Sequence, residues 1–267
     1  ILWQAKPHIG PDRLAPTVRN LRQRILGLGG TVHFGACVTD LEQKNGRLRA
    51  IRYIQGGETV LLPTEHAILA IGHSARDTFS MLWSMGIPMA QKSFAVGMRI
   101  EHLQSRMNQA LYGKFAHHPA LGAADYKLVT HLPEGRSVYT FCMCPGGQVV
   151  AAASEPAHVV TNGMSCFARD GKNANSALLV GVQPEDFGSN HPLAGVEFQR
   201  RIEHQAYLAA GRTYMAPAIT VGDFLLNRTP KAYGAVQPTY TPGTVLLPPE
   251  AYLPPFVCHS LRLDVCK

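Results

Sequence analysis

The chain has 267 residues, of which 46% are apolar and 16% are charged, and its formal net charge is +7 at pH 7. This composition indicates a globular protein with room for one large domain or two ordinary ones. The basic residues are dispersed and form no run with interleaved aromatics, which argues against nucleic acid as a partner. No apolar stretch approaches the ~20 residues of a membrane span, and no signal peptide is recognisable.

Cysteine usage points to a reducing compartment. Six cysteines in a chain of this size do not make a disulfide scaffold, so we expect free thiols and a cytoplasmic location. Cys142 and Cys144 form a C-x-C pair, which is neither a C-x-x-C redox motif nor half of a zinc site. We therefore predict no metal site, and we favour a packed pair before a tight turn over a redox role.

The first part of the chain predicts a helix and several short strands. Apolar residues at helical spacing, with arginines between them, predict a helix over residues 14–28 that ends at glycines. Short strands are predicted at 31–34 and 37–41. Asn45-Gly46 is a strong hairpin signal, and it predicts a meander that continues through strands at 48–54 and 59–62.

A continuous apolar run, Ala67–Ile71, is followed by Gly72 and by a helical pattern that opens at Asp77. A run of this kind predicts a strand buried on both faces of a parallel sheet. Ligands of such sheets sit beyond the carboxyl ends of the strands, where glycine allows close approach. An ordinary strand-to-helix turn in any α/β protein would have the same pattern.

The pattern changes after residue 88. Strands are predicted at 94–100, 126–131, 137–143 and 148–153, the last pairing with the one before it, and together they predict an antiparallel sheet. A helix is predicted over 103–113. Arg99 lies between apolar residues of the first strand, where it could form a structural ion pair or hold an anion, because its guanidinium offers a fixed fork of donors. His102 is interpreted as a loop histidine or a general acid/base.

Beyond this sheet the sequence predicts a turn at Asn162-Gly163, a polar loop over 168–176 and a strand over 177–182. A helix is predicted over 196–208 and a turn-rich linker over 238–243. Residues 246–257 are expected to lead back to the first part of the chain.

Several blocks in series resemble one family. They are AKPHIGPDRLAPTVRNLRQRI, AIGHSARDTFSML, FAVGMRIEH, AADYKLV, FCMCPGG, SEPAHVVTNGMS, ARDGKNANSALLV and PLAGVEFQRRIE. The family is the uncharacterised FAD-dependent dehydrogenases, or NAD(P)/FAD-dependent oxidoreductases. The resemblance implies an α/β fold, namely part of a Rossmann-like FAD domain of the two-dinucleotide-binding-domain type, with an inserted, mainly antiparallel β-rich α+β domain.

The resemblance also implies boundaries and a cofactor. Residues 1–88 would be a partial FAD-binding domain, 89–243 an inserted substrate domain, and 244–267 a segment returning toward the FAD domain. No G-x-G-x-x-G is present, so we expect an internal fragment of a flavoprotein that uses FAD, with NAD(P)H as an electron donor. Such a fragment alone should be poorly soluble, should not retain FAD and should be inactive.

Site residues follow from the same resemblance. The cofactor-binding candidates are Cys37, Val38, Thr39, Ala70, Ile71, Gly72, His73 and Ser74. The substrate-pocket candidates are Arg99, His102, Asn162, Ser165, Arg169, Asn173 and Asn175. The expected partner is a small, anionic substrate, while the catalytic residues and the oligomeric state are left open.

Two other functions fit the sequence. One is a non-catalytic module that binds a nucleotide or an anionic metabolite. The other is a tRNA-modifying flavoprotein, prompted by the positive charge.

Overall fold

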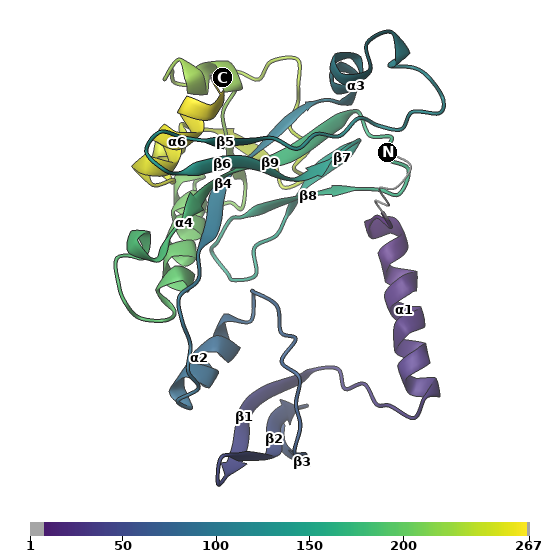
Figure 1. Cartoon of the computed structure of the whole chain (residues 1–267), viewed down its shortest axis with the longest axis vertical. Helices are drawn as coiled ribbons and strands as arrows, with labels where there is room; N and C mark the ends of the chain where they lie inside the picture. Colours follow the sequence, from purple (N-terminus) through teal and green to yellow (C-terminus); the bar gives the residue numbers. More distant parts are fainter. Residues whose placement is uncertain (1–7, 266–267) are drawn as a thin grey trace. The chain divides into compact units, whose positions relative to one another are not determined.

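The computed structural model describes residues 8–265, which form two compact units (Figure 1). The meander unit comprises residues 16–91 and 191–196. The sheet unit comprises residues 8–15, 92–190 and 197–265. The expectations for residues 1–7, and the interpretation of Cys266 as a free thiol, lie outside the described residues.

The meander unit is built around an antiparallel sheet in the order β1-β2-β3. Its elements are α1 (Pro11–Gly27, whose first turn belongs to the sheet unit), β1 (Ala36–Lys44), β2 (Arg47–Gln55), β3 (Glu58–Pro63) and α2 (Arg76–Ser84). Asn45 and Gly46 both have positive φ, at 55° and 71°. These values are those of a type I′ turn, so the predicted hairpin is confirmed.

Two predicted strands of this unit are wrong. Residues 31–34 and 67–71 are not in strands, and Ile68 is 94% exposed. A strand needs a neighbour for its N–H and C=O groups, and no described strand pairs with Ala67–Ile71. The parallel-sheet layer predicted around this run is therefore absent from the described residues, although the helix after it is confirmed as α2.

The sheet unit contains a four-stranded antiparallel sheet in the order β4-β9-β6-β5. Its strands are β4 (Phe94–Leu103), β5 (Val129–His131), β6 (Ser137–Cys144) and β9 (Asn173–Val182). This sheet and the sheet of the meander unit are separate, and the predicted mainly antiparallel sheet is confirmed.

One face of this sheet packs on the core. Val180 of β9 forms one hydrophobic cluster with Val257 and Leu261 of helix α6, and Val96 and Met98 of β4 pack against this cluster. Both α6 residues are fully buried. The alternation of apolar side chains along β4 and β9 therefore directs every second residue into this core and the others to the opposite face.

A two-stranded ribbon replaces the predicted pairing of 148–153 with 137–143. β7 (Gly147–Ala151) pairs with β8 (Thr161–Ser165) instead. The predicted turn at Pro145-Gly-Gly147 is present at residues 145–146, but it does not close a hairpin because β7 pairs with β8. Gly146 packs on the backbone at Arg169, where a Cβ would lie 1.9 Å from the carbonyl oxygen. Asn162-Gly163, in contrast, is not a turn. It lies within β8, because pairing with β7 overrides its local turn preference.

The remaining elements of the sheet unit follow in chain order. They are α3 (Gln104–Tyr112), η1 (Gly113–Phe115), η2 (Pro184–Phe187), α4 (Ala194–Ala209, whose first turn belongs to the meander unit), β10 (Ala216–Ala218), α5 (Val221–Leu225), β11 (Thr244–Leu246), η3 (Pro249–Ala251) and α6 (Pro255–Val265). The helices predicted at 103–113 and 196–208 are confirmed as α3 and α4. None of the described helices is long and apolar enough to cross a bilayer. The division at residues 88 and 243 stays a prediction.

Candidate functional site

The polar face of the four-stranded sheet carries Arg99. Arg99 and Glu101 of β4 lie opposite Ala177 and Asn175 of β9, on the face turned away from α6. The β7–β8 ribbon lies against this face, since Gly163 of β8 approaches Arg99 and Asn175 directly. Strand alternation thus gathers polar groups between the sheet and the ribbon.

Arg99 is half-buried and donates hydrogen bonds to three other strands. Its Nη1 donates to the Cys142 carbonyl at 3.3 Å and to the Asn175 Oδ1, and its Nη2 donates to the Asn162 Oδ1 at 3.3 Å. All three acceptors are neutral. No carboxylate forms an ion pair with Arg99 in the part of the chain that the structure describes. The structural ion pair considered from the sequence is therefore not formed there.

A bulge in β6 makes the Cys142 carbonyl available. The pairing of β6 with β9 is regular up to Phe141 and resumes only at Cys144, so the residues between them are unpaired. Cys142 has a φ of +46°, which is unusual for a residue with a side chain. The bulge thus diverts the strand where its carbonyl accepts from Arg99, and bulges of this kind are common beside functional sites.

Gly163 and Asn175 define how tightly the cluster is packed. A Cβ on Gly163 would lie 2.1 Å from both Arg99 Nη1 and Asn175 Oδ1, so any larger residue would require these two side chains to move. Asn175 is fully buried, and its Nδ2 has no hydrogen-bond partner among the described residues. An unpaired buried amide donor costs free energy, which a ligand or an ordered water would recover.

Three of the predicted pocket residues have other roles. Asn173 is buried and donates to the Glu101 carboxylate at 3.2 Å and to the Gln237 carbonyl at 2.9 Å, which ties a distant loop to the sheet. Ser165 is buried and donates to the Pro145 carbonyl at 2.7 Å. Arg169 contributes its backbone to the Gly146 turn with a φ of +53°, and its buried Nε has no partner in the described structure.

His102 lies in β4 and not in a loop, where it pairs with Ala174 on the other face of the sheet, so its interpretation as a loop histidine is wrong. Its ring is 5.5 Å from that of Tyr126, and its Nε2 is buried with no partner among the described residues. Burial lowers the pKa of His102 against the smaller opposing effect of Glu101, so the imidazole is neutral near pH 7. Burial raises the pKa of Tyr126, while a hydrogen bond with Ser176 and the charge of Arg99 oppose this rise.

The two cysteines of the C-x-C motif differ in environment. Cys142 is exposed, whereas Cys144 is buried and donates to the Cys142 carbonyl at 3.2 Å. Burial and the neighbouring Cys142 raise the pKa of Cys144 to about 11, against an opposing effect of Arg99. A thiol of this kind is mostly protonated at neutral pH and is a weak nucleophile.

The cofactor-binding candidates all lie in the meander unit. Cys37, Val38 and Thr39 are exposed on β1, and the segment from Ala70 to Ser74 forms the loop that precedes α2. Gly72 has a φ of +69°, and a Cβ there would meet nothing within 4 Å. The loop is therefore open to a ligand's approach, but contact with FAD stays a prediction, as does the predicted proximity of Gly72 and Val38.

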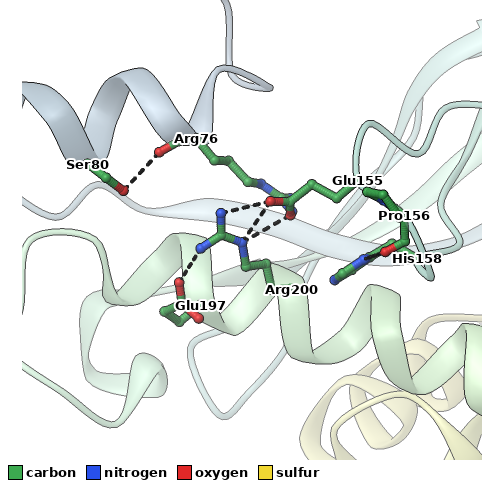
Figure 2. A network of polar contacts seen from close by, with 7 residues as sticks. All are labelled: Arg76, Ser80, Glu155, Pro156, His158, Glu197 and Arg200. Atoms are coloured by element: carbon green, nitrogen blue, oxygen red, sulfur yellow. Dashed lines mark hydrogen bonds and ion pairs between the residues drawn. The ribbon is translucent and has the colours of Figure 1, made fainter. Parts of the chain in front are cut away.

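The sequence did not point to an ion-pair network around Arg200. Arg200 binds both carboxylate oxygens of Glu155, with distances of 2.8–3.1 Å, and also reaches Glu197 (Figure 2). Glu155, His158 and Glu203 offer ligand atoms within 4.8 Å of one another, a spacing that a metal ion could use. Arg200 already neutralises the charge of Glu155. We therefore interpret Glu155, His158 and Glu203 as a structural cluster that holds residues 155–158 against α4.

A separate hollow of about 430 Å³ lies between α4 and residues 249–256. Asp186 and Glu250 in its wall are each paired with an arginine, Arg136 at 2.7 Å and Arg262 at 2.6 Å. None of the predicted site residues lines it. Because both of these carboxylates are already neutralised by arginines, neither offers an unpaired charge to a ligand. The Arg99 cluster is the better candidate because, among the described residues, no carboxylate forms an ion pair with its arginine.

Comparisons with known proteins agree with this architecture. The family described as "FAD-dependent protein, C-terminal domain-like" matches residues 93–266, which include all strands of the sheet unit. An uncharacterized protein from Clostridium beijerinckii is 46% identical over 264 residues, which are 98% of this chain and 49% of that protein. The chain thus spans about half the length of that relative. From residues 93–266, this chain belongs to the family of FAD-dependent proteins, in the region of their C-terminal domain.

Proposed function

We propose that the protein is an FAD-dependent oxidoreductase and that the sheet unit presents the substrate to the flavin. The match of residues 93–266 to an FAD-dependent family carries this proposal. When bound, FAD would supply the electron transfer, and the protein would bind and orient the substrate.

The residues available for FAD fit a partial site. The exposed segment Cys37–Thr39 and the open loop at Gly72 offer main-chain groups, and glycine at positive φ lets a backbone approach a ligand closely. The glycine-rich turn that usually holds a dinucleotide pyrophosphate is not in this sequence. In our proposal the remaining contacts come from parts of a longer protein, as the length of the relative suggests.

The first test is the flavin content of the intact natural protein. We expect one FAD per chain, read from its visible absorbance after purification, and bleaching of this band on anaerobic addition of NADH or NADPH. A purified protein that neither contains nor takes up FAD would remove the oxidoreductase proposal. Retained FAD without bleaching would remove only the nicotinamide donor.

The second test addresses the Gly72 loop. Gly72→Asn keeps a residue that tolerates positive φ but adds a side chain on the approach path. We expect reduced FAD occupancy. Gly86→Asn is the matched control, because Gly86 is in the same unit, has a φ of +75° and also has free space around a Cβ. Equal FAD content in both variants would remove Gly72 from the site.

The described cysteines are free, which supports our proposal of a reducing, cytoplasmic location.

A further inference from the structure

The Arg99 guanidinium has a donor left for a ligand. Both N–H groups of Nη1 serve the Asn175 side chain and the Cys142 carbonyl, and one N–H of Nη2 serves Asn162. Arg99 also forms a side-chain hydrogen bond with the buried Cys144 thiol, so at least one of its five N–H groups is left for a ligand. An N–H of an arginine forms a strong, charge-assisted hydrogen bond with a carboxylate oxygen.

The local charge corresponds to a monoanion. The three protein acceptors of Arg99 are neutral. Glu101, two residues along on the same face, keeps its negative charge because its partners Thr239 and Asn173 are neutral donors. A site with one arginine and a nearby carboxylate suits a monoanion better than a phosphate dianion, which usually meets several cations or a helix N-terminus.

An apolar surface continues from Arg99 across the sheet. Arg99 pairs with Ala177 on β9, and Ala177 pairs with Phe141 on β6, so the three residues form one cross-strand row on one face. The next row on that face pairs Leu179 with Tyr139. Phe141 is 62% exposed, so its ring offers apolar surface to a ligand. Two strand spacings place Phe141 roughly 10 Å from Arg99, with only a methyl group between them.

We propose that this row is a binding site for a small monocarboxylate with an apolar or aromatic body. The carboxylate accepts a hydrogen bond from the remaining N–H of Arg99 and another from the exposed amide of Asn162, and the body lies over Ala177 against Phe141. The unpartnered, fully buried Nδ2 of Asn175 beside Arg99 is an independent sign of a polar site that the protein alone does not complete. As a substrate site this rests on the proposed oxidoreductase function, whereas the binding itself does not.

The test is equilibrium dialysis of the intact protein with radiolabelled 3-phenylpropionate and with radiolabelled acetate, at constant ionic strength. We expect saturable binding of 3-phenylpropionate that is tighter than that of acetate. Arg99→Gln should weaken both by about tenfold or more, since the positive charge and a charge-assisted hydrogen bond are lost. Arg106→Gln, which removes the charge of an exposed arginine on α3, is the matched control and should bind as wild type.

Phe141→Ala keeps the test decisive if Arg99→Gln does not fold, because Phe141 is on the surface. It should weaken 3-phenylpropionate by roughly three- to tenfold and leave acetate unchanged. The control is Phe115→Ala, another exposed phenylalanine, in η1.

Several outcomes would overturn the proposal. The first is the absence of saturable binding. The second is that the wild type and Phe141→Ala each bind 3-phenylpropionate no more tightly than acetate. The third is displacement of 3-phenylpropionate by inorganic phosphate at equal concentration. Flavin content is measured in the same samples. A flavin-free protein that binds the carboxylate contradicts only the oxidoreductase function, and a flavin-loaded protein that does not bind it contradicts only this site.

Discussion

Replacing Gly163 by alanine tests whether the Arg99 cluster is as closely packed as the structure indicates. The new Cβ would lie 2.1 Å from Arg99 Nη1 and from Asn175 Oδ1, whereas ordinary contacts begin at 3.4 Å. The atoms must therefore separate by 3.4 − 2.1 = 1.3 Å. Backbone strain plays no part, since Gly163 has no positive φ.

The cost can be estimated from this overlap. Overpacking of a closed site costs about 1–3 kcal/mol, and a lost hydrogen bond to a charged donor costs roughly 1.5–3 kcal/mol. Replacing a strand glycine by alanine by itself stabilises the strand by about 0.5–1 kcal/mol. We expect a net loss of local stability of about 1.5–5.5 kcal/mol.

Hydrogen–deuterium exchange measured by mass spectrometry on peptides from β8 and β9 is the suitable assay, because it reports local stability. Amides of both strands should exchange at least tenfold faster in Gly163→Ala, since 1.4 kcal/mol corresponds to about a factor of ten. The control is Gly181→Ala in β9, where a Cβ would meet only the Ser137 carbonyl oxygen, at 3.9 Å. Equal protection in the two variants would show that Arg99 and Asn175 do not occupy the space beside Gly163.

Three further predictions concern titratable groups in the sheet unit. Arg136 lowers the pKa of Asp186, so this pair stabilises the fold above pH ~4 and loses its effect as the pH falls through the lowered pKa. In urea titrations, Asp186→Asn should lower the free energy of unfolding by about 1–3 kcal/mol at pH 7 and by progressively less below pH ~4. Burial lowers the pKa of His102, so the fold loses stability as the pH drops below ~6.5. His102→Leu should remove this loss between about pH 7 and 5. If the free energy of unfolding changes with pH in the variant as it does in the wild type, the prediction is wrong. At pH 8, iodoacetamide should modify exposed Cys142 well before Cys144, whose pKa is about 11, and peptide mass spectrometry would reveal the reverse order.

Local sequence signals predicted the elements that depend on local interactions. The alternation in β4, the Asn45-Gly46 turn and the helical spacing of α4 each act within a few residues, and all three appear as predicted. The failures depend on distant partners. Ala67–Ile71 has the pattern of a buried strand, yet no described strand lies beside it, and Asn162-Gly163 became strand because β7 pairs with it.

The candidate site shows the same limit. Arg99, Asn162 and Asn175 were predicted as pocket residues, and the structure joins them through hydrogen bonds, but Asn175 lies in β9 and not in a loop. Phe141 and Gly163 were missed. Their roles follow from the pairing of β6 with β9 and from the bulge at Cys142, which no pattern within β6 reveals. Once the register is known, the row of Arg99, Ala177 and Phe141 can be read from it.

The surface of the meander unit predicts how the chain behaves alone. Leu61 and Leu62 are neighbours on β3 and therefore point to opposite faces, yet they are 49% and 47% exposed. Helix α1 has no buried residue, although its apolar stripe includes Leu21, which is 62% exposed. Ile68 is exposed as well. Apolar side chains are therefore exposed to solvent on the sheet, on the helix and on the loop, and surfaces of this kind promote association.

We therefore expect the 267-residue chain, expressed by itself, to aggregate and to lack FAD, since its exposed loop at Gly72 offers contacts to only part of the cofactor. The measurement is the soluble fraction, with size-exclusion chromatography and the flavin band of whatever remains in solution. If the bare apolar groups cause the aggregation, Leu62→Glu with Ile68→Glu should raise the soluble fraction, because both side chains are exposed. Leu82→Glu, at a residue only 4% exposed in the same unit, should lower it. A soluble monomer with one FAD per chain would mean that these surfaces need no further cover and that residues 1–267 hold the cofactor by themselves.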